Sequence, residues 1–427
     1  MKTLNLKGLD EQIFYDKCDN GLEIYLWVNK KVKNFYATLN IKYGSVDTEF
    51  AFKNKKTIHK VPKGIAHFLE HLKFNQPNGI SAHEYYSKLG SNINAFTSYD
   101  YTAYEVIAGN NFKENINYLL DYVQTPYFTK EAVNKEKGII IEEIKMYDDN
   151  PGFKLFSTTN ECLYNKDNHK YLVSGTIEDV RKTTVEDINL VYDTFYHPEN
   201  MFMVITGNFN PEEALALIEE NQSKKTFIPY KNPHKIKEKE SVKVFNTYKE
   251  IYHNVEVPKI KIAFKMKRSN FESISDLDLR LYLNGIMKSL FGQTSILKEH
   301  LLKNNLISGE LVIGVIVKDN YVILSVIAET NYPKEIIKTI RETMNNINID
   351  EKEIKRKNKA GISNTVLTYD DIEAVNSDLQ EDIITYNEVI TDIIPKLKSL
   401  NLNDTKKVIS SIKTNNSTVI VLYPKGK

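Results

Sequence analysis

The sequence has few cysteines, little glycine and proline, and no long apolar run. Its two cysteines, Cys18 and Cys162, lie far apart, which argues against a disulfide framework and a cysteine-based metal site. No segment approaches the roughly 18 consecutive apolar residues of a transmembrane helix. The opening residues, MKTLNLK, lack the apolar stretch of a signal peptide. These absences predict a cytoplasmic protein without a membrane segment.

Neither sign of charge dominates the composition. Lysine and arginine number 57 against 56 for aspartate and glutamate, which leaves a net charge of +1. This balance provides no long-range field that would attract nucleic acid or an anionic membrane, so we expect neither as a partner. With 427 residues, of which 41% are hydrophobic, the chain is long enough to bury a substantial core and to form more than one domain.

What the sequence does contain is a pair of histidines four residues apart. In the segment His67-Phe68-Leu69-Glu70-His71, both imidazoles fall on one face of a helix, because an α-helix repeats about every 3.6 residues. Two such imidazoles suit one zinc ion, and the carboxylate of Glu70 reaches the same face. A zinc site of this composition is typical of water activation. The alternative is a helix with two ordinary histidines.

A second, acidic segment offers the missing metal ligand. Glu136 and Glu143 lie two helical turns apart and share a face, whereas Glu142 is rotated by about 100° and points away. We therefore assign Glu143 as the third zinc ligand and Glu136 as a carboxylate that hydrogen-bonds a ligand histidine. A charged surface helix is the alternative, although three consecutive isoleucines in the segment argue against full solvation.

An apolar strand, a polar turn and an amphipathic helix recur along the chain. Strands at 106–110, 204–208 and 326–330 lead into helices at 112–123, 211–221 and 333–346, and a last strand lies at 417–423. This recurrence indicates an internal repeat of an α+β domain. We expect two homologous halves, 1–225 and 245–427, joined by a polar linker at 226–244. Each half should form an antiparallel-rich sheet covered by helices, and only the first carries the histidine motif.

The two motif segments together resemble the pitrilysin/insulinase family of zinc metallopeptidases. HxxEH is the inverse of the HExxH motif and the signature of inverzincins. Residues 64–72, GIAHFLEHL, are similar to that family's zinc-binding helix, and residues 135–151, which end in KMYDDNP, are similar to its distal glutamate helix. The resemblance, to the bacterial processing-peptidase-like subgroup, implies a clamshell-like pair of α+β domains, a Zn²⁺ cofactor and peptide-bond hydrolysis.

Residues 91–98, SNINAFTS, resemble the family's edge strand beside the metal. In relatives this strand binds the substrate backbone by β-addition, as an exposed sheet edge does. The resemblance therefore assigns substrate binding to Asn94, Ala95, Phe96 and Thr97. The alternative is an ordinary strand flanked by polar turns.

The second half departs from the family pattern. Active relatives carry an arginine and a tyrosine there that help to hold the substrate carbonyl, and an ungapped alignment puts Leu301 and Ser308 at these positions. Neither side chain stabilises an oxyanion as arginine or tyrosine does. Paired members of the family divide the work between two chains. The resemblance thus implies a heterodimer with a related, metal-free chain that supplies the arginine and tyrosine.

The expected chemistry is zinc-dependent cleavage of small or unstructured peptides. His67, His71 and Glu143 hold Zn²⁺, and Glu70 accepts a proton from water and later passes it to the leaving amine. The alternative is a non-catalytic, zinc-containing subunit that binds peptides or serves as a scaffold in a larger complex. The presence of all three ligands together with Glu70 disfavours the scaffold subunit. The peptide-binding subunit stays open, because the sequence does not separate it from a slow peptidase that lacks the arginine and tyrosine.

Overall fold

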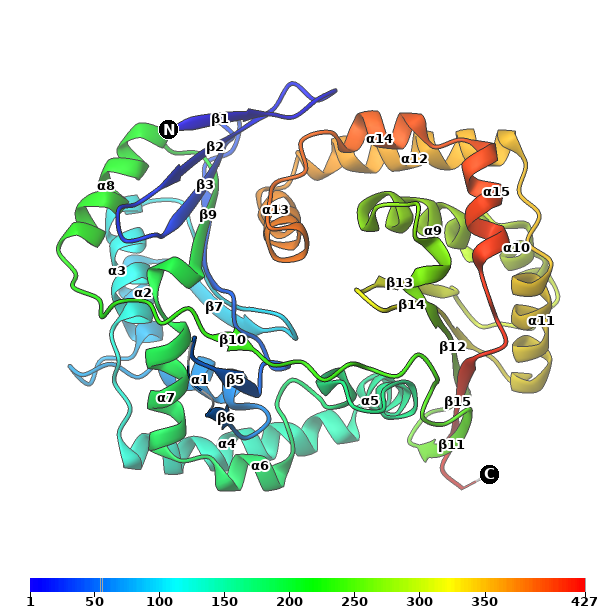
Figure 1. Cartoon of the computed structure of the whole chain (residues 1–427), viewed down its shortest axis with the longest axis horizontal. Coiled ribbons are helices and arrows are strands. Elements are labelled where there is room, and N and C mark those ends of the chain that lie inside the picture. The colour runs from blue at the N-terminus through cyan, green and yellow to red at the C-terminus, as the bar shows by residue number, and fades with distance from the viewer. Residues whose placement is uncertain (54, 56, 427) are drawn as a thin grey trace. The chain divides into compact units, whose positions relative to one another are not determined.

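The computed structural model describes residues 1–53, 55 and 57–426, which fall into two compact units (Figure 1). Unit 1 comprises Met1–Ile144, Leu172–Lys237 and Val366–Ile393. Unit 2 comprises Lys145–Tyr171, Glu238–Thr365 and Ile394–Lys427. Each unit is α+β, with a mainly antiparallel sheet and helices packed against it, as the sequence predicts.

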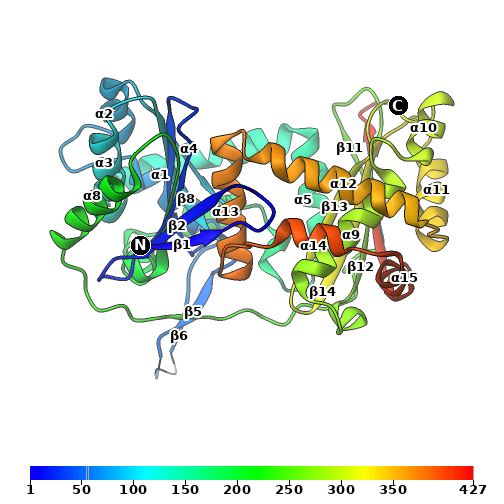
Figure 2. The ribbon, with the colours of Figure 1, turned by 90° about the horizontal axis from the view of Figure 1, so that it is seen from above.

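Unit 1 is built on a seven-stranded sheet in the order β1-β2-β3-β9-β4-β8-β7. Its neighbouring strands are antiparallel except for β3 and β9. These strands are β1 (Lys2–Asn5), β2 (Gln12–Lys17), β3 (Glu23–Val28), β4 (Phe35–Ile41), β7 (Asn92–Thr97), β8 (Thr102–Ala108) and β9 (Met201–Gly207). A small second sheet contains β5 (Glu49–Ala51), β6 (Ile58–Lys60) and β10 (His234–Lys235). Its β5–β6 hairpin projects away from the large sheet in Figure 2.

Helices cover both faces of this large sheet. One face packs against α1 (Ile65–Lys73), α2 (Ala82–Leu89), α3 (Phe112–Gln124), α4 (Lys130–Asp149), α6 (Ile177–Lys182), α7 (Val185–Phe195) and α8 (Pro211–Ser223). The other face packs against α13 (Ile372–Tyr386). All seven residues of β4 are buried, because this central strand contributes side chains to both cores.

Unit 2 has a five-stranded sheet in the order β11-β15-β12-β14-β13, in which only β11 and β15 are parallel. Its strands are β11 (Tyr248–His253), β12 (Lys259–Lys267), β13 (Val312–Val317), β14 (Tyr321–Glu329) and β15 (Ser417–Pro424). Helix α5 (Pro151–Leu163) covers one face. The remaining helices are α9 (Asp276–Phe291), α10 (Ile296–Lys303), α11 (Pro333–Asn345), α12 (Glu351–Thr368), α14 (Ile393–Ser399) and α15 (Leu402–Ser411).

The strand orders confirm the internal repeat. The run β3-β9-β4-β8-β7 in unit 1 has the same order and directions as β11-β15-β12-β14-β13 in unit 2. Helices α3, α8 and α11 lie within two residues of the predicted ranges 112–123, 211–221 and 333–346. The compact units nevertheless differ from the predicted halves, 1–225 and 245–427. Helix α5 belongs to unit 2 and α13 to unit 1, so each half contributes one helix to the other unit.

The predicted linker, 226–244, is partly structured. Strand β10 pairs with β5, and Lys235 Nζ lies 2.7 Å from Asp47 Oδ2. Further along, the side chain of Glu240 is buried and paired with Lys265. The polar composition of this segment therefore reflects specific ion pairs as well as solvent exposure.

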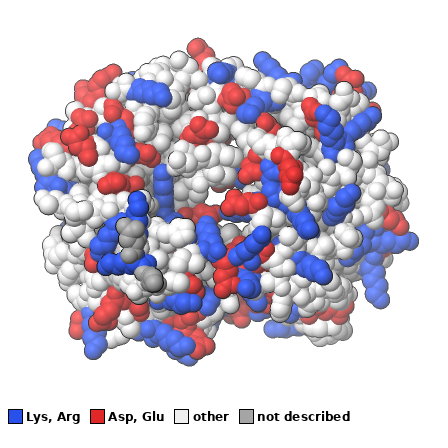
Figure 3. All heavy atoms as spheres, in the orientation of Figure 1, with Lys and Arg blue, Asp and Glu red and all other residues white. Residues whose placement is uncertain are grey.

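Charge and hydropathy are distributed as the composition predicts. Figure 3 shows basic and acidic side chains interspersed over the visible face, in keeping with the net charge of +1. Among the described residues, none of the helices has the length and apolar character that crossing a bilayer requires.

Candidate active site

Helix α1 presents the two histidines because its other faces are fixed in the core. It begins after Gly64, whose φ of +79° and close approach to Ser174 both require glycine. A Cβ on this residue would lie 2.1 Å from the Ser174 carbonyl oxygen. The apolar residues of α1 are buried: Ile65, Ala66, Phe68, Leu69 and Leu72. His67 and His71 therefore share the remaining face, with their ring centroids 4.5 Å apart.

Helix α4 brings Glu143 to both histidines. Its Oε1 lies 3.6 Å from His67 Nε2, and its Oε2 lies 3.4 Å from His71 Nε2. One ligand atom from each of the three residues lies within 4.8 Å of the others. Two imidazole nitrogens and one carboxylate oxygen form the donor set that zinc takes in catalytic sites, where a fourth position stays open. The residues present therefore fit a zinc ion.

Glu136, two turns earlier on α4, contacts the opposite nitrogen of one histidine. Its Oε1 lies 2.8 Å from His71 Nδ1. Burial alone would lower the pKa of His71, but the carboxylates of Glu136 and Glu143 raise it to about 10. A proton on Nδ1 that is donated to Glu136 leaves Nε2 as the ligand atom. Nδ1 of His67 is buried and has no hydrogen-bond partner in the described part of the chain, so only His71 is oriented in this way.

Glu70 lies beside the histidines in a buried setting, with 7% of its surface exposed. Its Oε2 accepts a hydrogen bond of 2.7 Å from Thr97 Oγ1. Burial raises the pKa of Glu70 above its ordinary value, although the neighbouring His67, the Thr97 hydroxyl and His71 each oppose the shift. A carboxylate of raised pKa is better suited to accept a proton from water and return it.

The predicted substrate-binding residues all lie on β7, an edge strand that pairs only with β8 among the strands of the described chain. Asn94 is exposed. Ala95 packs against the core, and the Phe96 ring packs edge-to-face on Tyr101 at 5.5 Å. Thr97, at the end of the strand, instead holds Glu70. The open edge thus ends at the buried carboxylate.

Sequence spacing gives no signal for the Thr97–Glu70 contact, because the two residues lie 27 positions apart on different elements. His197 is held by a contact close to it in the chain and by a stacked aromatic ring. Its Nδ1 accepts a hydrogen bond from the Glu199 backbone N–H at 3.2 Å, and its ring stacks on Tyr230. These contacts give His197 a structural role.

In unit 2 the two aligned positions offer no strong hydrogen-bond donor. Leu301 lies in α10 and is 1% exposed, packed in the core of the unit. Ser308 is exposed, and its backbone N–H donates to the Glu329 carbonyl oxygen. Residues 295–310 contain neither arginine nor tyrosine, so a small shift of the alignment would not supply one.

The fold and the candidate ligand set together are those of the inverted-motif class of metallopeptidases, and comparison with known proteins gives the family. Residues 59–176 match the insulinase domain of peptidase family M16, and residues 182–360 match the domain described as the M16 inactive domain. The chain belongs to peptidase family M16. It is 32% identical over 439 residues to the uncharacterized zinc protease YmfH of Bacillus subtilis, with 100% of both chains covered.

Two solved structures share the fold along nearly the whole chain. A protein from Alicyclobacillus acidocaldarius described as an M16-like peptidase superposes with a TM-score of 0.90 at 26% identity, covering 98% of this chain and 99% of that one. A protease from Helicobacter pylori superposes with a TM-score of 0.82 at 18% identity, covering 97% and 100%. These likenesses confirm the two-domain α+β fold.

Proposed function

We propose that the chain is the zinc-binding, catalytic subunit of a heterodimeric endopeptidase that cleaves small or unstructured peptides. One observation carries the proposal. A ligand triad of His67, His71 and Glu143 stands beside the buried carboxylate of Glu70, and the hydrogen bond from Thr97 joins that carboxylate to an open strand edge. A metal, a proton acceptor and a peptide-binding edge are the three components that metal-assisted hydrolysis needs.

Each residue has a definite task in this proposal. Zinc held by His67, His71 and Glu143 would act as a Lewis acid toward a water molecule and a peptide carbonyl. Glu70 takes a proton from the attacking water and gives it to the leaving amine. Glu136 orients His71 by accepting its Nδ1 proton. Backbone groups of β7 at Asn94, Ala95, Phe96 and Thr97 pair with the substrate in extended form.

The partner in this proposal is a related, metal-free chain. Leu301 is buried and Ser308 has only a small hydroxyl side chain, so neither stabilises the charge that develops on the substrate carbonyl. A second chain that presents an arginine and a tyrosine would complete the site. We assign the catalytic part to residues 1–225 and the supporting homologous part to 245–427, with 226–244 between them.

We place the activity in the cytoplasm, where cysteine thiols stay reduced. Cys18 and Cys162 are both free and buried. The second candidate is a zinc-containing subunit that captures peptides or acts as a scaffold without cutting them, and the side chains at Leu301 and Ser308 favour it over a peptidase that acts alone.

The test is cleavage of a mixed library of unstructured peptides by the purified chain with zinc, alone and with its metal-free homologue from the same genome. We expect cleavage only with the homologue, and its loss with a chelator. Glu70→Gln should keep the metal and lower the cleavage rate by about 10²- to 10⁴-fold. Full activity in Glu70→Gln would refute the role of Glu70, and bound zinc without cleavage in any mixture would favour the capture subunit.

A further inference from the structure

The face of the unit 2 sheet that packs against α5 is only partly covered. A row of cross-strand neighbours on this face runs from Val312 on β13 through Ile327 and Lys261 to Ile420 on β15. Ile420 is buried under α5, whereas Val312 is 55% exposed. The next apolar residue of β13 on this side, Ile316, is 38% exposed. We call the region formed by the exposed Val312 and Ile316 and the half-buried Lys261, Ser325 and Ile327 the open face.

Lys261 is out of place on this face. Its Nζ lies 5.4 Å from the centre of the Phe156 ring of α5, and no hydrogen bond or ion pair joins it to any other described residue. A carboxylate on the same side, Glu329, is paired with Lys259. Burial lowers the pKa of Lys261 to about 8, so the side chain still carries its charge at neutral pH. A partly buried cation without a counter-ion is costly unless a ligand supplies one.

The shape of the open face also accommodates a ligand. Gly314 stands opposite Ser325, and a Cβ at this position would lie 2.6 Å from Ser325 Oγ. Because residue 314 is glycine, no side chain stands between Val312 and Ile316 on this face of the strand. Apolar groups lie on both sides of Lys261, with Phe156 on one side and Ile327 on the other.

We propose that the open face binds a peptide segment in which an aspartate or glutamate stands between apolar residues, with Lys261 receiving the carboxylate. The unpaired charge specifies an acidic group, and the flanking apolar side chains specify its neighbours. A carboxylate in the middle of a peptide can have an apolar residue on each side, and these residues can contact the apolar side chains on both sides of Lys261. A carboxylate at the end of a peptide has a neighbour on one side only. The inference rests on the proposed function, because it names the class of peptide that the enzyme selects.

Binding, rather than cleavage, tests the proposal. The full chain carrying Glu70→Gln is loaded with zinc and titrated with three fluorescent peptides. The first two are capped at both ends and carry a central Glu or Gln between leucines, and the third carries the central Gln and a free carboxyl terminus. We expect the Glu peptide to bind about tenfold more tightly than the capped Gln peptide. The free terminus should add less than about twofold.

Lys261→Met keeps the apolar stem and removes the charge, so it should reduce the Glu preference to about one. Lys338→Met, at a lysine with a side-chain exposure of 75% on α11, should keep the preference. Lys261→Arg retains a cation and should keep part of it, which separates a charge effect from misfolding. The proposal would be overturned if the parent protein bound the capped Glu and Gln peptides equally, or if the Glu preference survived Lys261→Met. A gain in affinity from the free carboxyl terminus alone would also overturn it. A Glu preference in a protein that cleaves no peptide, either alone or with its metal-free homologue, would instead count against the proposed peptidase function.

Discussion

Two pairs of helices occupy equivalent places in the two repeats of the fold. They are α1 and α4 in unit 1, and α9 and α12 in unit 2. In each unit the first helix of the pair follows the central strand, β4 or β12, and the second follows the helix after strand β8 or β14. The first pair holds His67, His71 and Glu143 together. Among the described residues, no such metal-ligand group occurs in unit 2.

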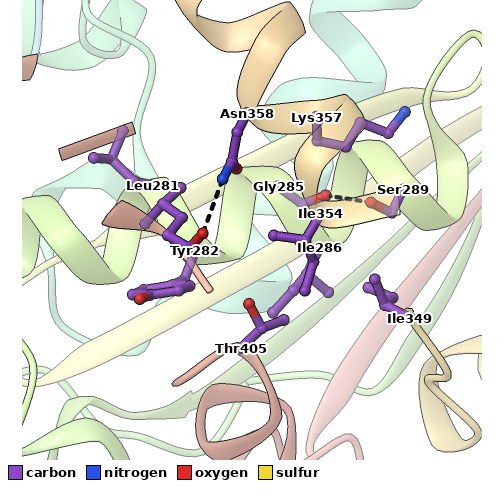
Figure 4. A pocket seen from close by; sticks show the side chains of 11 residues that line it. Leu281, Tyr282, Gly285, Ile286, Ser289, Ile349, Ile354, Lys357, Asn358 and Thr405 are labelled. Carbon is purple, nitrogen blue, oxygen red and sulfur yellow. Dashed lines mark hydrogen bonds between the residues drawn. The ribbon is translucent and has the colours of Figure 1, made fainter. Parts of the chain in front are cut away.

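The pair in unit 2 encloses a small, mostly apolar cavity instead. Figure 4 shows Tyr282, Gly285 and Ile286 of α9 facing Ile354 of α12 across it. The cavity has a volume of about 20 Å³, enough for no more than one water-sized group. Asn358 Nδ2, at the edge of this cavity, donates to the Leu400 carbonyl oxygen at 2.9 Å. The same fold therefore carries a metal-ligand group in one unit and a small apolar cavity in the other. The difference depends on a few side chains along one helix face.

Buried charge is also used differently in the two units. In unit 2, Lys265 Nζ donates to Glu240 Oε1 at 2.7 Å and to the Leu163 carbonyl oxygen at 2.8 Å. Glu240 also accepts backbone N–H groups of residues 165–167. Burial alone would raise the pKa of Glu240, yet these donors lower it. This closed network has a structural role, whereas the buried carboxylates of unit 1 surround two histidines with ligand atoms available.

The largest effect, a loss of bound zinc, is expected when a histidine of the proposed metal site is removed from α1, so that α1 resembles α9. His71→Ala removes one of the three proposed ligands and the partner of Glu136, so zinc should fall from one ion to below about 0.1 per chain, and cleavage should fall to the level with a chelator. Metal analysis of the purified variant measures this. His300→Ala, at an exposed position of α10, is the control and should retain full zinc. Stoichiometric zinc in His71→Ala would exclude His71 as a ligand.

The unit 2 network should be nearly as sensitive, but through stability. Glu240→Ala leaves the buried Lys265 ammonium without its counter-ion and three backbone N–H groups without their acceptor, which we expect to cost about 3–5 kcal/mol. Urea denaturation measures the change. Glu238→Ala removes an exposed carboxylate that pairs with Lys166 and should cost at most about 1 kcal/mol. Equal losses in the two variants would mean that the buried network contributes no more than a surface pair.

A smaller effect is expected from the contact behind the metal site. Glu136→Gln weakens the orientation of His71 and should reduce zinc affinity by about 10- to 100-fold. Competition with a fluorescent chelator measures this affinity. Glu142→Gln, an exposed position on the same helix, should change it by less than about twofold. An unchanged affinity in Glu136→Gln would show that the helix positions His71 without help.

The parts of the molecule that local spacing governs are predictable from sequence. Intervals of three, four and seven residues place His67, Glu70 and His71 on one helix face and Glu136 and Glu143 on another, and strand–helix recurrence reveals the repeat. These rules require only the helical and strand periods. The structure brings the three ligand residues together from two helices, and the family match accounts for the pairing of the two segments.

The remaining features depend on long-range packing. The hydrogen bond between Thr97 and Glu70 spans 27 residues, and the contact between Lys265 and Leu163 spans 102. The packing of α5 in unit 2 and of α13 in unit 1 also lies beyond local pattern, because an apolar helix face does not specify which of two similar sheets it covers. The polar composition of 226–244 predicts a solvated linker that includes Glu240. The burial of Glu240 depends on Lys265 of strand β12, which lies outside this segment.

The smallest predicted effect is a change in stability when one glycine in each helix pair is replaced. Gly138 of α4 and Gly285 of α9 are interior helical glycines, and a Cβ at either would meet no atom within 4 Å. Replacing each with alanine should stabilise the chain by about 0.5–1 kcal/mol, because alanine loses less backbone entropy in a helix. Gly285→Ala should give the larger gain, since its methyl group enters the cavity of Figure 4 whereas Gly138 is exposed. Urea denaturation of both variants measures the difference. Zinc affinity should remain unchanged in each, and a loss of stability at Gly285 would show that the cavity does not accept a methyl group.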